Sequence, residues 1–165
     1  MKRTEGQAAI LDIIHAATPG HLAGIRRLFK AYAGSLGFDL AFQNFDAELA
    51  GLPGAYAPPA GRLLLAMEND DAAGCVAMRP LGHGVCEMKR LYVKPEYRGL
   101  GLGRRLAEEI VGEARRAGYR SMRLDTVPAL SEAIALYKSL GFVEIEPYCH
   151  NPIEGATFME LKLGS

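Results

Sequence analysis

The sequence predicts a single mixed α/β domain, with a mixed, mostly antiparallel sheet of six to seven strands flanked by about four helices. Short apolar runs separated by polar turns between residues 62 and 93 are typical of strands in hairpins, which place neighbours antiparallel. A glycine-rich loop at 99–103 then opens a helix, and another strand and helix follow it. A strand, helix, strand passage indicates a right-handed parallel crossover, so the sheet must mix both orientations.

Composition places the chain among ordinary globular proteins. Its 165 residues suit one domain, spanning residues 1–165, and 49% of them are hydrophobic. The 19 basic and 19 acidic residues cancel, so no global charge favours nucleic acid or an anionic membrane as a partner. Asp12 and His15 interrupt the N-terminal apolar segment, and no apolar run approaches the length of a membrane span. We therefore expect a cytoplasmic protein that binds neither nucleic acid nor membrane.

Three cysteines, Cys75, Cys86 and Cys149, leave an odd count at spacings that match no zinc pattern. We expect them to be small apolar residues of the interior rather than part of a disulfide framework. The sequence therefore predicts no metal site.

The N-terminal third is expected to hold one strand and two helices. Residues 8–16 indicate a strand that ends before Thr18 and Pro19. These two residues suit the start of a helix, with Thr18 as the N-cap and Pro19 at the first helical position. Apolar residues then recur at three- and four-residue steps, as on the buried face of an amphipathic helix. The segment 34–59 mixes glycine, proline and aromatic residues, and its length predicts a role beyond connection, with a short helix at 45–52.

The rest of the chain alternates strands with two helices. Strands are expected at 62–68, 72–79, 86–93, 121–126, 142–145 and 157–163, and helices after Gly103 and at 131–142. Pro95 ends the strand at 86–93 because it has no N–H to continue a ladder.

The loop from Arg98 to Gly103 lies where this central strand passes into a helix. A helix start offers unpaired backbone N–H groups and the positive end of the helix dipole, and glycine lets a ligand approach closely. With Arg98, the loop is therefore a candidate phosphate or pyrophosphate site. A ligand-free turn is the alternative, because an isolated G-x-G is a weak signal. A dinucleotide fold has the wrong spacing, and no P-loop motif occurs.

The order of motifs resembles the GNAT N-acetyltransferase superfamily. Arg98-x-x-Gly101-x-Gly103, preceded by the strand KRLYV, is similar to the family's acyl-coenzyme A motif, and SEAIALYKSLGF is similar to its next motif. The resemblance implies a central strand splayed from the strand after the crossover helix, often with a bulge, here expected between Lys89 and Val93. It also implies a pantetheine arm paired with that strand and a pyrophosphate on the loop. The implied cofactor-binding residues are Leu91, Tyr92, Val93, Arg98, Gly99, Leu100, Gly101, Leu102, Gly103 and Arg104.

An amine that attacks a thioester must lose a proton, and the oxyanion and the departing thiolate must be stabilised. Glu87 matches the place where some family members carry a glutamate base, and Asp125 is the alternative. An ion pair of Glu87 with Lys89, Arg90 or another basic residue would explain the same glutamate without a catalytic role. The family binds the oxyanion with a backbone N–H of the central strand, here Leu91 or Tyr92. Tyr137 holds the position of the family's tyrosine near the coenzyme sulfur, and a phenol near pKa 10 can protonate a thiolate. The implied catalytic residues are Glu87 and Tyr137.

The acceptor is the least determined part of the prediction. Arg79, Lys89 and Arg90 could meet a carboxylate, and His150 with Asn151 could line the pocket mouth, which favours a small amino-acid-like amine. The family resemblance also implies that the first-helix region helps form this pocket, and its candidates are Tyr32, Phe38 and Phe42. Ordinary surface charge and core packing explain the same residues equally well.

The function predicted by this resemblance is transfer of an acetyl group from acetyl-coenzyme A to a primary amine by direct attack. The alternatives are acetylation of a protein N-terminus or lysine, and a non-catalytic module that binds or senses acyl-coenzyme A. Pairing of the C-terminal strand across a homodimer rests on analogy alone.

Overall fold

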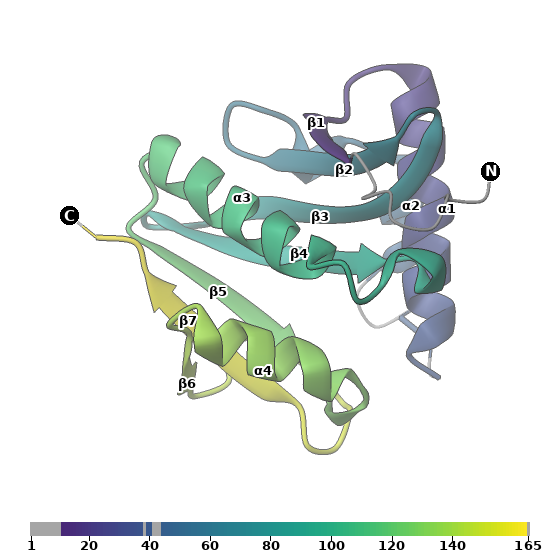
Figure 1. Cartoon of the computed structure of the whole chain (residues 1–165). Coiled ribbons are helices and arrows are strands. Elements are labelled where there is room, and N and C mark those ends of the chain that lie inside the picture. Colours follow the sequence, from purple (N-terminus) through teal and green to yellow (C-terminus); the bar gives the residue numbers. More distant parts are fainter. Residues whose placement is uncertain (1–10, 38, 41–43, 165) are drawn as a thin grey trace.

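The computed structural model describes residues 11–37, 39–40 and 44–164 (Figure 1). One seven-stranded sheet, in the order β1-β2-β3-β4-β5-β7-β6, forms the centre of the molecule. The strands are β1 (Asp12–His15), β2 (Arg62–Glu68), β3 (Asp71–Gly82), β4 (Val85–Val93), β5 (Ser121–Thr126), β6 (Val143–Ile145) and β7 (Thr157–Lys162). The α-helices are α1 (Pro19–Ser35), α2 (Phe45–Ala50), α3 (Leu102–Arg116) and α4 (Ser131–Ser139). Within these described ranges, only β4 and β5 pair in parallel, and every other neighbouring pair is antiparallel. The mixed sheet predicted from the sequence is thereby confirmed.

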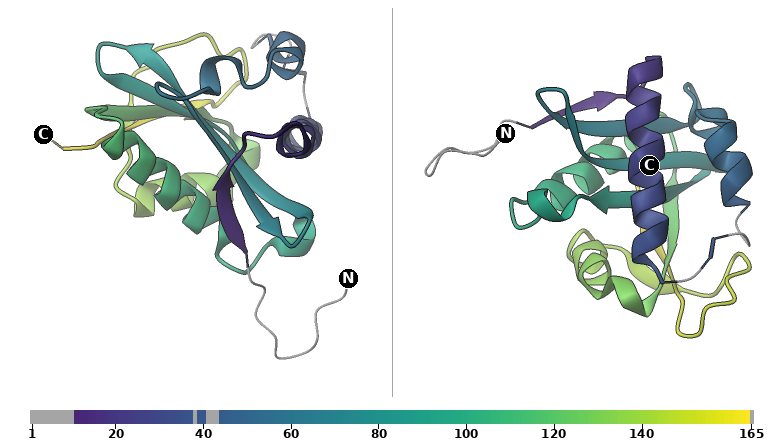
Figure 2. Two further views of the ribbon diagram at one scale, coloured as in Figure 1. Left: turned by 90° about the horizontal axis from the view of Figure 1, so that it is seen from above. Right: turned by 90° about the vertical axis from the view of Figure 1, so that its right-hand side faces the viewer.

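Helices cover both faces of the sheet, with α3 and α4 on one face and α1 and α2 on the other (Figure 2). The predicted amphipathic spacing explains why α1 forms here: Ile25, Leu28 and Phe29 are all buried against the sheet. Its start is fixed as expected, since the Thr18 hydroxyl accepts a hydrogen bond of 3.1 Å from the backbone of His21. The sheet therefore separates two apolar cores.

Alternation along β4 and β5 assigns side chains to these two faces. Met88 and Leu124 belong to the core beneath α3 and α4. Because successive residues of a strand point to opposite faces, Glu87, Lys89 and Asp125 point to the α1 and α2 side. This division determines from which face of the sheet each of these side chains can contact a ligand.

The central strands separate soon after they begin to pair. Only residues 85–87 of β4 pair with β5, opposite residues 121–123, and beyond Glu87 the two strands diverge (Figure 1). A bulge at Arg90, whose φ is +63°, accompanies the divergence. One residue of β3 lies between Cys75 and Ala77, whereas two residues of β4 lie between their partners Tyr92 and Lys89. The bulge lies in the range that the family resemblance implies, and the splay begins just before that range.

Several boundaries differ from the expected ones. The described part of the first strand begins at Asp12, and residues 8–10 of the predicted strand lie outside the described residues. Helix α4 ends at Ser139 rather than at 142, because Gly141 takes a φ of +102° and turns the chain toward β6. In the described ranges, none of the helices combines the length and the apolar character that crossing a membrane requires.

Candidate active site

A wide cleft lies between the end of β4 and the start of α3. Its free volume is about 540 Å³. Eight of the ten residues implied for coenzyme binding line it: Leu91, Tyr92, Val93, Arg98, Gly99, Gly101, Leu102 and Gly103. Leu100 and Arg104 do not line it. Leu100 is half exposed, and Arg104 donates a hydrogen bond of 2.6 Å to Ser139 of α4.

Two glycines shape the loop at the mouth of this cleft. Gly99 and Gly101 have φ values of +81° and +79°, which glycine adopts far more readily than other residues, and Gly101 is the N-cap of α3. A Cβ at either position would meet nothing within 4 Å, so the space in front of the first helical turn is open. Arg98 is held beside it, donating from Nε to the Val93 carbonyl at 2.9 Å. Open N–H groups beside a cation fit the phosphates of an acyl-coenzyme A.

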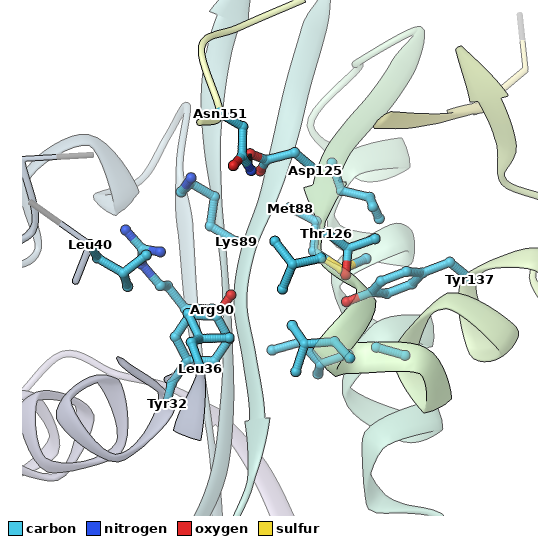
Figure 3. Close-up of a pocket in the computed structure, with 15 residues that line it drawn as sticks. Tyr32, Leu36, Leu40, Met88, Lys89, Arg90, Asp125, Thr126, Tyr137 and Asn151 are labelled. Carbon is cyan, nitrogen blue, oxygen red and sulfur yellow. Dashed lines mark hydrogen bonds between the residues drawn. The ribbon is translucent and has the colours of Figure 1, made fainter. Parts of the chain in front are cut away.

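A narrow pocket with a free volume of about 60 Å³ occupies the splay between β4 and β5 and adjoins the wide cleft (Figure 3). Both faces of the sheet contribute to it. Tyr137 of α4 and Thr126 at the end of β5 lie on one side, and Lys89, Asp125 and Asn151 lie on the other. A group held between the strands can therefore be reached from both faces of the sheet.

Tyr137 is buried, with 7% of its surface exposed, and packs at a tilt against Phe142, with the ring centroids 5.7 Å apart. Its hydroxyl points into the narrow pocket (Figure 3). Burial raises the pKa of this phenol, so it carries its proton at neutral pH.

A third pocket, of about 320 Å³ free volume, opens on the α1 and α2 side of the strands. It shares Lys89 and Asp125 with the narrow pocket. Its lining carries charges of both signs, from Arg79, Lys89, Glu48, Glu87 and Asp125, together with Asn44, Cys149 and His150. Such a lining can hold a ligand that itself carries both charges.

Glu87 is almost fully buried, and both of its carboxylate oxygens already have partners. Oε1 accepts from Arg79 Nε at 2.9 Å and lies 3.8 Å from Lys89 Nζ, and Oε2 accepts from the Tyr148 hydroxyl at 2.7 Å. Burial alone would raise its pKa, but Lys89, Tyr148 and Arg79 together hold the pKa below the ordinary value. Burial also lowers the pKa of Lys89. Glu87 is therefore a stable carboxylate and a weak proton acceptor.

Asp125 occupies a different place in the same network. It lines both the narrow pocket and the third pocket, whereas Glu87 lines only the third. Its Oδ2 accepts from Asn151 Nδ2 at 3.0 Å, and Cys149 Sγ lies 3.9 Å from the same oxygen. Its Oδ1 makes no hydrogen bond within the part of the chain that the structure describes.

The structure also brings to the site two residues to which the sequence assigned no role, Glu48 and Tyr148. Glu48 of α2 accepts both hydrogen bonds of a bidentate pair with Arg90, one of the three basic residues that the sequence offers as partners for a substrate carboxylate. Neither residue belongs to a motif, so only the folded chain brings them to the site. Of the aromatic candidates for the acceptor pocket, Tyr32 lines both the wide cleft and the narrow pocket. Phe38 and Phe42 lie outside the described residues.

Comparisons of the sequence with known proteins agree on the family to which the chain belongs. Residues 22–142 match the family model described as the acetyltransferase (GNAT) family. An uncharacterized N-acetyltransferase of Schizosaccharomyces pombe is 48% identical over 155 residues, covering 93% of this chain and 95% of that protein.

Solved structures agree on the fold. An acetyltransferase of the GNAT family from Staphylococcus aureus superposes with a TM-score of 0.78 at 19% identity, over 93% of this chain and 99% of its own. An acetyltransferase from Salmonella typhimurium, solved with its cofactor acetyl-CoA, superposes with a TM-score of 0.66 at 21% identity, over 93% and 94% of the two chains. The predicted family is thereby confirmed: the chain belongs to the GNAT acetyltransferases and is an acyl-coenzyme A-dependent N-acyltransferase.

Proposed function

We propose that the enzyme transfers the acetyl group of acetyl-coenzyme A directly to the primary amine of a small amino-acid-like acceptor. The observation that carries this proposal is the meeting of three connected pockets at the splay of β4 and β5. The wide cleft suits the coenzyme, and the narrow pocket suits the thioester. The third pocket, here called the charged pocket, opens on the α1 and α2 side of the sheet and suits the amine.

The acyl donor would lie along the open edge of β4. Its pantetheine arm would pair with the backbone of residues 91–93 as an added strand, and its pyrophosphate would bind the first turn of α3 beside Arg98. The thioester carbonyl would then accept a hydrogen bond from the backbone N–H of Leu91 or Tyr92, which stabilises the oxyanion as the amine attacks. Leu100 and Arg104, which were also expected to bind the coenzyme, lie outside the cleft lining and would contribute least.

Asp125 is the better placed of the two candidate bases. An amine in the charged pocket reaches the thioester through the narrow pocket, and Asp125 lines both. Glu87 lies farther back, where β4 and β5 are still paired, and its oxygens are engaged. In this proposal Asp125 accepts the proton from the amine, directly or through a water, and Glu87 holds Arg79 and Lys89 in place.

Tyr137 is the proposed acid. Its hydroxyl points into the narrow pocket from the face opposite Asp125, and burial keeps it protonated. As the carbon–sulfur bond breaks, the electron pair goes to sulfur and the phenol can return a proton to the thiolate. In this proposal the base, Asp125, and the acid, Tyr137, act on the reacting group from opposite faces of the sheet.

The acceptor's carboxylate would pair with Arg79 and Lys89, while its amine faces Asp125. Arg79 has 40% of its side chain exposed and can still meet a ligand while it holds Glu87. A protein N-terminus or lysine would bring no carboxylate of its own to Arg79 and Lys89, which pair with Glu87 in the absence of a ligand. A non-catalytic module would have no need of an acid and a base on opposite faces. Free cysteines throughout the described chain suit the reducing cytoplasm, where we place the enzyme. A homodimer remains a prediction.

The test is a calorimetric titration with acetyl-coenzyme A, with NAD as the negative control, followed by a thiol-release screen of amino acids, polyamines and peptides. We expect binding of the coenzyme alone and turnover with amino acids that exceeds turnover with polyamines. Turnover with peptides alone would replace the proposed acceptor, and coenzyme binding without turnover on any amine would favour the non-catalytic module.

A further inference from the structure

The hydroxyl of Thr126 is buried without a partner. Thr126 is the last residue of β5 and has 4% of its surface exposed. Among the described residues, its Oγ1 and the hydroxyl of Tyr56 are the two buried side-chain polar atoms that make no hydrogen bond. Buried polar atoms in folded proteins almost always have a partner, so an orphaned hydroxyl calls for an explanation.

A structural role does not explain this hydroxyl. Leaving a buried donor unpaired destabilises the folded state, and valine has nearly the same shape without that cost. Valine also suits a strand at least as well as threonine does. The hydroxyl therefore points to a partner that arrives with a substrate.

The position of Thr126 restricts what that partner can be. Thr126 lines the narrow pocket of about 60 Å³ but not the wide cleft of about 540 Å³. The long pantetheine arm fits only the wide cleft, so the group that reaches Thr126 is the reacting end of the acyl donor. Strand alternation places Thr126 on the face of Leu124, and its hydroxyl points into the same part of the pocket as that of Tyr137 (Figure 3). This is the face from which Tyr137 is proposed to protonate the leaving sulfur, and it is opposite the face of Asp125.

We propose that the Thr126 hydroxyl donates a hydrogen bond to the coenzyme sulfur and stabilises it as the thiolate forms. This inference rests on the proposed function. In the reaction, the amine nitrogen forms its bond to the acyl carbon, the carbon–sulfur bond breaks, and the electron pair passes to sulfur. Tyr137 gives its proton to the sulfur and recovers one from water, while Thr126 keeps its proton and acts only through the hydrogen bond. The two hydroxyls therefore have different roles at the same atom.

The test compares Thr126→Val, which removes the hydroxyl but keeps the shape, with Thr126→Ser, which keeps the hydroxyl. Calorimetric titrations use coenzyme A and desulfo-coenzyme A as probes, and thermal unfolding is followed without ligand. We expect Thr126→Val to weaken coenzyme A binding by roughly threefold to tenfold, as for loss of one hydrogen bond to a neutral thiol. Binding of desulfo-coenzyme A should not change, Thr126→Ser should bind both like the wild type, and the ligand-free Tm of Thr126→Val should equal or exceed that of the wild type.

Thr157→Val is the matched control, because Thr157 lies opposite Thr126 in the ladder of β5 and β7 but lines none of the three pockets. It should leave both titrations unchanged. Coenzyme A binding that is unaffected by Thr126→Val, an equal loss for the desulfo probe, or a lowered ligand-free Tm would each overturn the proposal. A wild-type protein that binds coenzyme A but acetylates no amine would refute the proposed function alone, since the sulfur contact is measured by binding.

Discussion

Arg90, at the bulge of β4, donates two hydrogen bonds of 2.9 and 3.0 Å to the carboxylate of Glu48 on α2. The guanidinium also lies over the rings of Tyr32 and Phe45, at 5.7 and 5.2 Å from their centroids. A φ of +63° is unfavourable for arginine, so the surrounding contacts must hold it. The contacts of Arg90 therefore connect the bulge, which adjoins the proposed oxyanion donors Leu91 and Tyr92, to α1 and α2 on the acceptor side of the sheet.

Replacing Glu48 by glutamine is therefore expected to damage both stability and turnover. The side chain of Arg90 is 2% exposed, and replacing the Glu48 carboxylate by an amide removes a negative charge from beside a buried cation, which costs roughly 3 kcal/mol. Urea unfolding measures that loss, and kcat should fall more than the affinity for acetyl-coenzyme A. Glu160→Gln is the control, because its pair with Arg123 is more exposed and is worth at most about 1 kcal/mol. Equal losses in the two variants would contradict a special role for the bulge.

Gly101→Ala tests whether the loop from Arg98 to Gly103 binds the phosphates of the coenzyme. Its φ of +79° would strain alanine by about 1–2 kcal/mol, although a Cβ there has open space. Gly118, with a φ of +89° and equally open space, lies at the other end of α3 and supplies the matched control Gly118→Ala. We expect both variants to lose similar stability, but only Gly101→Ala to weaken coenzyme A binding in calorimetry. A coenzyme affinity that Gly101→Ala leaves unchanged would remove the loop from the binding site.

Tyr137→Phe tests the proposed acid. The ring and its packing against Phe142 remain, so coenzyme A should bind normally, whereas kcat should fall by about a hundredfold. Tyr119→Phe is the control, because that hydroxyl donates to the Ala60 carbonyl, away from the three pockets. Steady-state kinetics on the acceptor identified by the screen measures both. Unchanged turnover in Tyr137→Phe would show that the thiolate leaves without help from this phenol.

The sequence predicted the elements well because their signals are local. Glycines at 99–103 and the four-residue spacing after them fix the loop and α3, and the crossover rule then makes β4 and β5 parallel. The family resemblance rather than periodicity supplied the splay. The boundary of α4 was misjudged because the apolar pattern continues to Phe142, although Gly141 ends the helical geometry.

The charge network of the site was beyond sequence reasoning. Glu48 lies 42 residues before Arg90, and Tyr148 lies 61 residues after Glu87, so no spacing rule connects either pair. The sequence could place a carboxylate at Glu87, but it could not show that its oxygens are engaged. The orphaned hydroxyl of Thr126 likewise becomes visible only when its surroundings are known.

The partners of Glu87 predict how stability depends on pH. Its folded pKa lies below the ordinary value of 4.5, so the folded state favours the carboxylate. This contribution is complete above the unfolded pKa and is lost as pH falls through the folded pKa. Tm measured from pH 7 to pH 3 should therefore fall less steeply in Glu87→Gln than in the wild type. Glu144→Gln, at an exposed position on β6, should follow the wild-type curve; if it flattens the curve equally, the effect does not belong to Glu87.

The two candidate bases are separated by their effect on turnover as pH rises. If Asp125 accepts the amine proton, Asp125→Asn should lower kcat by about a hundredfold at neutral pH, because an amide cannot take that proton. Raising the pH supplies more neutral amine, so this loss should shrink as pH approaches the pKa of the acceptor. Glu87→Gln keeps the shape of its network but loses the charge that holds Arg79 and Lys89, so it should mainly raise the KM of a carboxylate-bearing acceptor. A loss in Glu87→Gln that high pH relieves, with Asp125→Asn near normal, would instead make Glu87 the base.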